Sequence, residues 1–185
     1  MNAALNPSLY EQLLALPEHV TGEILNGELY ALPRPSGRHA GASSALGMRI
    51  GPPFRFGEGG PGGWWIVDEP EVHFIRDVEI AVPDLAGWRR ERMPSMPEDH
   101  RFEIVPDWVC EILSPSTAKK DRVVKLPLYA HYGVAYVWIV DLAQTLESFE
   151  LREGHWSLLA ILKDADRVAV KPFDAVEFSL ADLWA

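Results

Sequence analysis

Two short apolar segments, residues 108–113 and 136–141, constrain the fold more than any other feature of the chain. Each is almost free of polar residues, which is typical of strands buried on both faces of a sheet. The segment between them predicts a helix that begins near Val123, has Pro127 in or just past its first turn and ends at Gly133. Strand, helix and strand at this spacing predict a parallel βαβ unit with a right-handed crossover.

Weaker signals on both sides of this unit complete an α/β (α+β) pattern. Ser8, with Glu11 three residues later, forms a capping box that predicts a short helix to about Leu16. An Asn-Gly pair between two apolar runs predicts a hairpin over residues 23–30. Residues 51–63 contain six Gly and three Pro and predict a loop. The remaining predictions are helices at 37–50 and 179–184, strands at 64–67, 72–75, 78–82, 146–151, 156–162 and 168–170, and a polar stretch at 88–102.

Length and composition limit the class of protein. The 185 residues are enough for one domain with a substantial core, so we expect a single domain over residues 1–185. Hydrophobic residues make up 48% and charged residues 24%, which excludes a mostly disordered chain. No apolar run approaches the roughly 18 residues of a membrane span, and we expect no signal peptide. A single cysteine, Cys110, excludes an internal disulfide and a cysteine-cluster zinc site. We therefore expect a cytoplasmic protein with no membrane contact.

The net charge restricts how the chain could bind nucleic acid. Seventeen Lys and Arg stand against 27 Asp and Glu, giving a formal charge of −10. Proteins that hold nucleic acid by diffuse electrostatics are normally basic. Any nucleic-acid role must therefore depend on a local basic patch or on metal ions bound to acidic residues. Two clusters hold seven of the 17 basic residues and are candidates for contact with a phosphate backbone: Arg89, Arg90 and Arg92, and Lys119, Lys120, Arg122 and Lys125.

Glu111 is the most informative polar residue, because it lies inside the apolar run 108–113 toward its carboxyl end. A buried carboxylate needs a cation or strong donors, and strands of α/β sheets present functional side chains at their carboxyl ends. Asp84 follows the predicted strand 78–82. The two carboxylates form a pair suited to Mg²⁺ or Mn²⁺. The alternatives are a structural Glu111 paired with arginine and an Asp84 that only belongs to a Pro-Asp turn. Asp107, in the second Pro-Asp pair, is predicted to be a solvated strand start.

Lys125 is the third element of the predicted site. If the helix packs back on the sheet, its first turn returns near the carboxyl end of the strand that carries Glu111. An ammonium there could orient or activate a water beside a metal-bound phosphate. The alternative is a surface pair with Asp121 at i,i+4, worth a few tenths of a kcal/mol. Clustered carboxylates should also repel one another and show raised pKa values without metal.

Other residues have less specific interpretations. His39, beside Arg38 at the start of a helix, either contacts phosphate, assists proton transfer or is structural. His73 alternates with two glutamates and is predicted on a solvated or interfacial face. Cys110 points to the opposite face of its strand from Glu111, so we expect it in the core. The scattered tryptophans are assigned to packing or an interface: Trp64, Trp65, Trp88, Trp108 and Trp138.

A set of positions along nearly the whole chain matches a known pattern. They are Glu111–Thr117, Asp121, Lys125, Tyr129, Gly133-Val134 and Tyr136–Asp141, with Glu23–Leu29, Arg38-His39 and Val82–Asp84 upstream. This pattern resembles the Uma-type family of restriction endonucleases, within the PD-(D/E)XK superfamily, and the block at 111–141 is its most specific part. The resemblance implies a restriction-endonuclease-like fold, a mixed central β-sheet flanked by helices. It also implies divalent-metal-dependent cleavage of DNA phosphodiesters.

The resemblance further implies roles for the site residues. Asp84 and Glu111 match the metal-binding acids of the superfamily, and Glu23 resembles an additional acidic position that some members use. The superfamily pattern has Lys two residues after the second acid, where this chain has Leu113. The lysine is then displaced onto the following helix, which makes Lys125 the candidate.

Several basic residues and the C-terminus complete these expectations. Lys119 and Lys120 are fallback candidates for the catalytic lysine. Members of the superfamily often pair, so a homodimer is expected, with residues 183–185 as a possible part of its interface. The candidates for contact with phosphate or DNA are Arg38, His39, Lys119, Lys120 and Arg122.

The sequence thus predicts an endonuclease that hydrolyses DNA phosphodiester bonds with Mg²⁺ or Mn²⁺. Carboxylate-bound metal neutralises the phosphate, generates hydroxide near neutral pH and stabilises the leaving oxygen. Two alternatives stay open. One is a catalytically inactive nuclease fold that serves as an interaction module, and the other is a metal-dependent phosphoesterase acting on nucleotides or RNA. No helix-turn-helix or zinc finger is recognisable, so base specificity is expected to be low or is not readable from the sequence.

Overall fold

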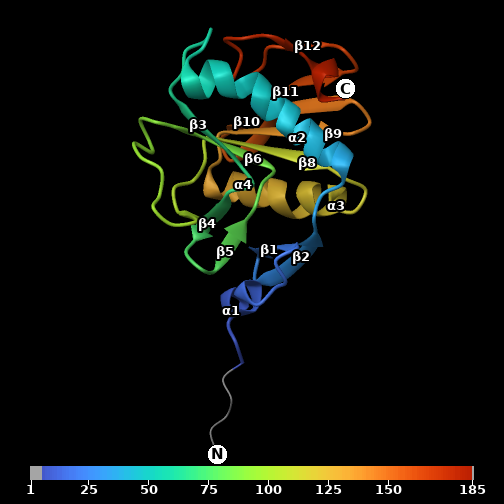
Figure 1. Ribbon diagram of the computed structural model, residues 1–185. Helices are drawn as coiled ribbons and strands as arrows, with labels where there is room; N and C mark the ends of the chain where they lie inside the picture. The colour runs from blue at the N-terminus through green and yellow to red at the C-terminus, as the bar shows by residue number, and fades with distance from the viewer. Residues whose placement is uncertain (1–5, 185) are drawn as a thin grey trace, which may run out of the picture.

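The computed structural model describes residues 6–184, which form two main β-sheets with helices packed against them (Figure 1). The larger sheet has six strands in the order β11-β10-β9-β8-β6-β3, and only the pair β8 and β9 is parallel among its neighbours. Its strands are β3 (Trp64–Asp68), β6 (Leu85–Arg89), β8 (Trp108–Leu113), β9 (Tyr136–Asp141), β10 (Thr145–Arg152) and β11 (His155–Lys163). A mixed sheet flanked by helices is the predicted fold class, and it is confirmed.

The predicted βαβ unit lies at the centre of this sheet. Strands β8 and β9 run parallel. All six residues of β8 are buried, and the largest exposed fractions are only 3% at Glu111 and 4% at Leu113. A continuous helical segment joins the two strands and consists of α3 (Ala118–Lys120), the π-helical turn η2 (Asp121–Lys125) and α4 (Leu126–Tyr132). It begins about five residues before the predicted start at Val123. Gly133 ends it in the left-handed region, as predicted.

The six-stranded sheet lies between two helical layers. Helix α2 (Gly37–Ile50) packs on one face, where Trp108, Cys110 and Ile112 of β8 join its core (Figure 1). The segment α3-η2-α4 covers the other face, which receives Val109, Leu113 and, between them, Glu111. Because strand side chains alternate, β8 is apolar toward α2 and carries its single carboxylate toward the other helical segment. Cys110 is in the core, as predicted.

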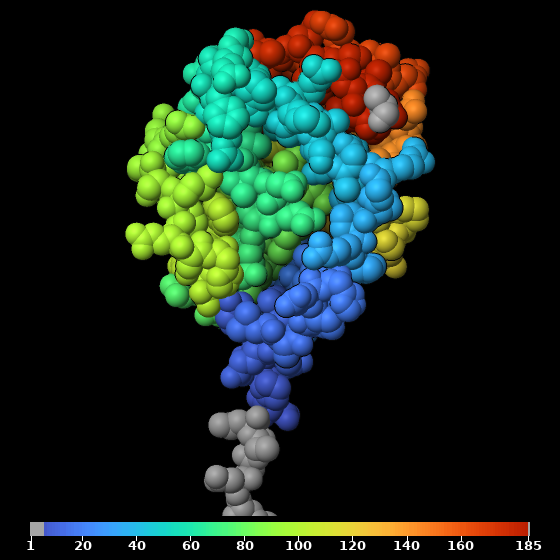
Figure 2. Space-filling view, in the orientation of Figure 1, coloured from blue at the N-terminus to red at the C-terminus, as the bar shows by residue number. Residues whose placement is uncertain are grey.

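The smaller sheet was not predicted as a unit. Its five strands have the order β2-β1-β5-β4-β7, and β1 and β2 form the predicted hairpin, with Asn26 and Gly27 both at positive φ. Helix α1 (Leu9–Leu14) has the predicted capping box and ends two residues earlier than expected. Together α1, β1 and β2 form the end of the molecule opposite the C-terminal segment (Figure 2). The strands are β1 (Val20–Leu25), β2 (Glu28–Pro33), β4 (Glu71–Ile75), β5 (Glu79–Ala81) and β7 (Arg101–Phe102).

Three local predictions are wrong. Residues 51–56 of the predicted loop form a π-helical turn, η1 (Gly51–Phe56), which buries Pro53 and Phe54. The predicted polar stretch begins inside β6, where Trp88 is fully buried. The C-terminal helix is a 3₁₀ turn, η3 (Leu180–Leu183), that follows the short pair β12 (Arg167–Val168) and β13 (Phe178–Ser179).

The C-terminus packs inward rather than outward. Leu183 is buried in the core on the α2 side, so it is not available for the expected dimer interface. Trp184 donates from its indole to the Asp164 carbonyl, and Ala185 lies outside the described residues. Within residues 6–184, the helices are too short or too polar to cross a bilayer.

Candidate active site

Strands β6 and β8 bring the two predicted metal-binding carboxylates to one place. Asp84 directly precedes β6, which pairs antiparallel with β8, so it lies beside the carboxyl half of β8 rather than only at the end of β5. Its Oδ2 accepts a hydrogen bond from the main-chain N–H of Ile112 at 2.6 Å. Glu111, the preceding residue in β8, is only 3% exposed. The pairing of two strands of one sheet therefore fixes both carboxylates.

Glu23 comes to the same place from the smaller sheet. It lies near the end of β1 and is 1% exposed. Its Oε1 accepts the main-chain N–H of Val82 at 2.9 Å, in the connection between β5 and β6. The chain passes from the smaller sheet to the larger one through this connection, so the two sheets meet at the site.

Lys125 joins the carboxylates of the two sheets. Its Nζ lies 2.7 Å from Glu111 Oε1 and 2.8 Å from Glu23 Oε1, and it donates to the Val82 carbonyl at 3.2 Å. Its side chain is buried, and so is Asp121, which excludes the alternative of a solvated surface pair. Glu111 has Lys125 as its cation, so the alternative of an arginine partner is also wrong.

A π-helical turn positions Lys125. Pro127 has no amide hydrogen to donate to the carbonyl four residues earlier, and the turn before it widens from α to π geometry at Asp121–Lys125. The segment can therefore continue through the proline without breaking. Such π-helical turns occur frequently at functional sites.

Two further side chains surround this ion pair network. Lys120 binds Glu23 Oε2, on the oxygen that Lys125 does not use. Tyr129, four residues after Lys125 and fully buried, donates its hydroxyl hydrogen to Glu111 Oε1. Tyr129 is among the positions that carry the family resemblance but was not predicted as a site residue, although its spacing of one helical turn from Lys125 was a usable signal. Lys119 is exposed.

Burial and charge shift the pKa values of the network in opposite directions. Burial raises the pKa of Glu111 to about 8, although Lys125 opposes this, and the nearby Asp121, Asp84 and Glu23 add to it. Burial would also raise the pKa of Glu23, but Lys125 and Lys120 outweigh it and the net shift is downward. The pKa of Lys125 is well above its ordinary value, because Glu111 and Glu23 outweigh the effect of burial. The predicted rise is therefore found at Glu111 and not at Glu23.

His39 binds the second carboxylate from helix α2. The ring is 6% exposed, and its Nε2 lies 3.2 Å from Asp84 Oδ1. Burial lowers the pKa of His39, but the hydrogen bond and charge of Asp84 outweigh it, so the pKa is raised. Arg38 lies on the exposed side of α2, where it donates to the Leu142 carbonyl at 3.4 Å.

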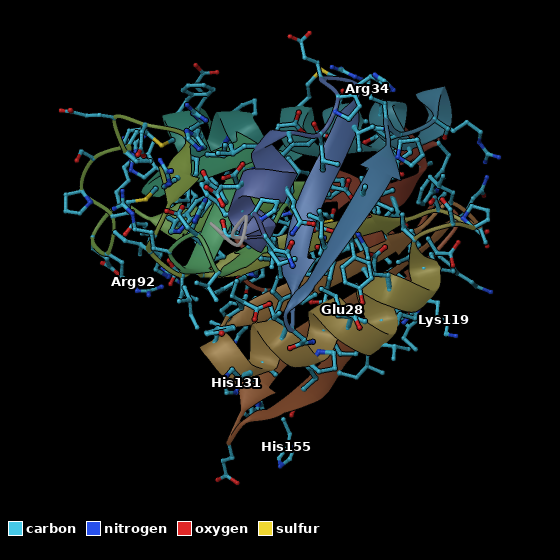
Figure 3. All side chains as sticks on the ribbon, turned by 90° about the horizontal axis from the view of Figure 1, so that it is seen from below. Glu28, Arg34, Arg92, Lys119, His131 and His155 are labelled. Atoms are coloured by element: carbon cyan, nitrogen blue, oxygen red, sulfur yellow. The ribbon has the colours of Figure 1, made fainter. Side chains whose placement is uncertain are left out.

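A pocket of about 410 Å³ opens onto these residues. It lies between the hairpin β1–β2 and the helical segment α3-η2-α4, which lie next to each other when the molecule is viewed from below (Figure 3). The functional side chains that line it are Glu23, His39, Asp84, Glu111, Lys120, Asp121 and Lys125.

The donor set fits a hard divalent cation with few protein ligands. Oε1 of Glu111 accepts both Lys125 and Tyr129, and within residues 6–184 no hydrogen-bond donor reaches Oε2. Asp84 presents Oδ1 to His39 and the pocket. No group of three or more His, Cys, Asp or Glu side chains in the described part of the chain is arranged to hold a metal ion. Mg²⁺ commonly takes one or two carboxylates, with water and substrate phosphate as its other ligands, so two carboxylates suffice.

Other polar residues do not lie where the sequence predicted. Asp107 is buried, not solvated: it accepts the Arg89 main-chain N–H at 2.8 Å and pairs with Arg92 at 2.7 Å. His73 is 1% exposed rather than solvated, with Glu71 on its Nε2 at 2.7 Å. Asp107 and His73 can be buried because each has polar partners within the chain.

The two predicted basic clusters do not form one surface. Figure 3 shows Arg92 and Lys119 on opposite sides of the molecule. Arg122 makes a bidentate ion pair with Glu147 of β10, which turns its guanidinium away from the pocket. Of the lysine cluster, only Lys120 and Lys125 line the pocket.

Comparisons with known proteins give the family and the fold of the chain. The model of the Uma2 family, described as "Putative restriction endonuclease", matches residues 8–181. The chain belongs to the Uma2 family. The match includes all four positions that the sequence singled out as catalytic, Glu23, Asp84, Glu111 and Lys125, and the family resemblance seen in the sequence is confirmed. Among curated proteins, none matches this Uma2 chain.

A solved structure shares the Uma2 fold. It is the crystal structure of a "putative nuclease belonging to DUF820" from Anabaena variabilis. The two chains are 23% identical, with a TM-score of 0.70 over 96% of this chain and 97% of the other. At this identity the likeness concerns the fold, and it extends over both sheets of the Uma2 chain.

Proposed function

We propose that this chain is a divalent-metal-dependent endonuclease that hydrolyses phosphodiester bonds in DNA. The observation that carries the proposal is the convergence of Glu23, Asp84, Glu111 and Lys125 on one pocket, from two sheets and a helix. Buried carboxylates beside a buried lysine are costly to fold, because each charge loses its hydration. Such an arrangement is expected at a functional site rather than in a structural core. The Uma2 family membership gives the reaction class.

In this proposal Asp84 and Glu111 hold Mg²⁺ or Mn²⁺. The cation, when bound, neutralises phosphate charge and lowers the pKa of a coordinated water. The Ile112 N–H fixes Asp84, and the Tyr129 hydroxyl fixes Glu111, so both carboxylates are oriented before any ligand arrives.

Lys125 positions the scissile phosphate and the attacking water. Its Nζ lies between Glu111 and Glu23, and its third hydrogen goes to the Val82 carbonyl, so contact with phosphate requires one of these three partners to be exchanged. Glu23 supports the site by holding this ammonium, and Lys120 at the pocket wall is a further candidate contact for phosphate. His39 acts through Asp84, because its contact is to that carboxylate.

Nicking of supercoiled DNA tests the proposal. The wild-type protein should nick plasmid in Mn²⁺ or Mg²⁺ and stop in a chelator. Asp84→Asn keeps an acceptor for the Ile112 N–H but loses the negative charge, and should reduce the rate at least about a hundredfold. No cleavage by the wild type, or cleavage that Asp84→Asn leaves unchanged, would contradict the proposal. Preferential cleavage of RNA or nucleotides in competition would instead favour the phosphoesterase alternative.

A further inference from the structure

A second surface feature lies outside the candidate active site. Arg55 and Phe56 at the end of η1 meet Trp65 of β3 and Arg90, which follows β6, and Arg89 at the end of β6 lies over the neighbouring Trp64. We call Arg55, Phe56, Trp65, Arg89 and Arg90 the arginine–aromatic patch. The Arg90 guanidinium stacks over the Trp65 ring at 4.0 Å, and that of Arg55 lies 5.8 Å from the same ring. Arg55 also lies 5.7 Å from the Phe56 ring. Figure 2 shows the segments around residues 55 and 90 meeting at one side of the molecule.

Aromatic rings and main-chain carbonyls hold these arginines in place. Arg89 lies 4.7 Å over the buried Trp64 ring. Arg90 donates to the Arg55 carbonyl at 2.7 Å and to the Trp64 carbonyl at 3.3 Å. Stacking on a ring orders a guanidinium without neutralising it. The patch is therefore a set of ordered positive charges.

The charges of the patch are not compensated by carboxylates. Within residues 6–184, no Asp or Glu oxygen lies within 4.0 Å of a guanidinium nitrogen of Arg55, Arg89 or Arg90. The neighbouring Arg92, in contrast, pairs with Asp107 at 2.7 Å. In a chain with a formal charge of −10, three adjacent arginines without acidic partners are a local exception. A polyanion is the ligand that complements such a surface.

Strand β6 connects the patch to the active site. Asp84 directly precedes this strand and Arg89 ends it. Five residues of extended chain span about 17 Å, at roughly 3.4 Å per residue. Residues 85–88 of this strand are buried, so only its two ends can face a ligand, and their separation is shorter than one turn of duplex DNA, roughly 34 Å.

We propose that the arginine–aromatic patch binds the phosphate backbone of the DNA whose scissile phosphate lies at Asp84 and Glu111. This inference rests on the proposed function, and it adds a contact surface for the part of the DNA that lies outside the pocket. Arginine forks bind phosphate oxygens. Phe56, which is 66% exposed, offers a ring for contact with a sugar or an unpaired base. Because these contacts are to the backbone, the patch confers affinity without base specificity.

The double variant Arg89→Ala/Arg90→Ala tests the patch. Its control is Lys163→Ala/Arg167→Ala, which removes the same charge from two exposed residues, one at the end of edge strand β11 and one in the short strand β12. Fluorescence anisotropy with a labelled 20-base-pair duplex, measured at several salt concentrations, gives the affinity and its salt dependence. The patch variant should bind about tenfold more weakly, with a salt slope smaller by up to about 1.8 for two lost contacts, and the control should bind like the wild type.

A small substrate separates this inference from the proposed function. Hydrolysis of bis(p-nitrophenyl) phosphate in Mn²⁺ needs only the pocket, so the patch variant should hydrolyse it at the wild-type rate. Failure of the wild type in this assay would count against the proposed function, whereas the duplex titration judges the patch by itself. Arg89→Ala alone, which removes only a ring contact, serves if the double variant does not fold.

Three results would overturn the patch as a DNA-binding surface. The first is equal duplex affinity in the patch variant and the control. The second is the absence of measurable duplex binding by the wild type. The third is an equal loss of affinity for a polyglutamate peptide of matched charge, which would assign the patch to acidic polymers in general.

Discussion

Lys125 shows how single residues in this site depend on one another. Its ammonium is buried between Glu23 and Glu111 and also donates to the Val82 carbonyl. Each charge in such a group is costly to dehydrate, and the cost is offset only while its partners are present. Lys125, which is proposed to position phosphate, therefore also offsets the cost of burying the carboxylates of Glu23 and Glu111.

Removing Lys125 should consequently unfold the protein more easily. Lys125→Met keeps most of the side-chain volume but leaves Glu23 and Glu111 without their shared cation. We expect the free energy of unfolding in urea to fall by about 3–5 kcal/mol. Lys119→Met, the same substitution at an exposed lysine six residues earlier, should change it by less than about 0.5 kcal/mol. Similar losses in both variants would show that the ion pairs do not stabilise the fold.

The raised pKa of Glu111 predicts a pH-dependent stability in the absence of metal. The folded-state pKa is about 8, against an ordinary value of 4.5, so the folded protein binds this proton more tightly than the unfolded chain. The stabilisation is complete below about pH 4.5 and is lost as the pH rises to about 8, by an amount on the order of a few kcal/mol. Glu111→Gln cannot ionise and should not show this loss.

Urea unfolding of both proteins in chelator, at about pH 5 and about pH 8.5, measures the difference. Contributions from other groups, such as the raised pKa of Asp121, are common to the two proteins and largely cancel. Relative to Glu111→Gln, the wild type should lose stability between these pH values. Parallel pH profiles would mean that Glu111 is ionised throughout.

At the scale of elements, β6 depends on a glycine that allows two tryptophans to approach. A Cβ at Gly87 would lie 3.2 Å from the Trp108 ring and 3.3 Å from the Trp64 ring. Gly87→Ala should therefore lower the free energy of unfolding by about 1–3 kcal/mol through overpacking. Gly41→Ala, on the open side of α2 where no atom lies within 4 Å, should instead raise it by about 0.5–1 kcal/mol.

Thermal or urea denaturation of the two alanine variants checks this contrast. The two substitutions should change the free energy of unfolding with opposite signs. The methyl group at position 87 enters a filled space, whereas the one at position 41 only reduces the conformational freedom of the unfolded chain. Equal effects would contradict the role of Gly87 in seating Trp64 and Trp108.

The elements that the sequence predicted well are those with a continuous local signal. Strands β8 and β9 are apolar along their whole length, and Gly133 supplies a left-handed helix end. The start of the helical segment was predicted too late, because Pro127 indicated a first turn there. The π-helical turn before the proline absorbs its missing donor, and no pattern in the sequence marks it. Strand β6 was missed because its apolar run is short and contains Gly87.

At the scale of the whole molecule, the errors come from partners far apart in the sequence. Asp107 was predicted to be a solvated strand start, yet it is buried with partners in Arg89 and Arg92, 15 or more positions away. His73 is buried by Tyr10 of α1 as well as by its neighbours in the smaller sheet. The convergence of Glu23 with Lys120 and Lys125, about 100 positions later, rested on a family resemblance, because no local signal pairs the hairpin with the helix.

The net negative charge of the whole chain also has to be compatible with binding of DNA. An excess of acidic residues is compatible with a DNA substrate if metal neutralises the phosphate at Asp84 and Glu111 and a separate basic surface holds the backbone. The central claim is therefore that Asp84 and Glu111 form one cation site, and it can be tested without any substrate.

Calorimetric titration of Mn²⁺ into the wild type, Asp84→Asn and Glu111→Gln measures this directly. Glu58→Gln, at an exposed glutamate outside the pocket, controls for lost charge. The account predicts binding by the wild type and by Glu58→Gln, and at least about tenfold weaker binding by each of the other two folded variants. A wild type that binds no Mn²⁺, or binding that survives unchanged in both Asp84→Asn and Glu111→Gln, would contradict it.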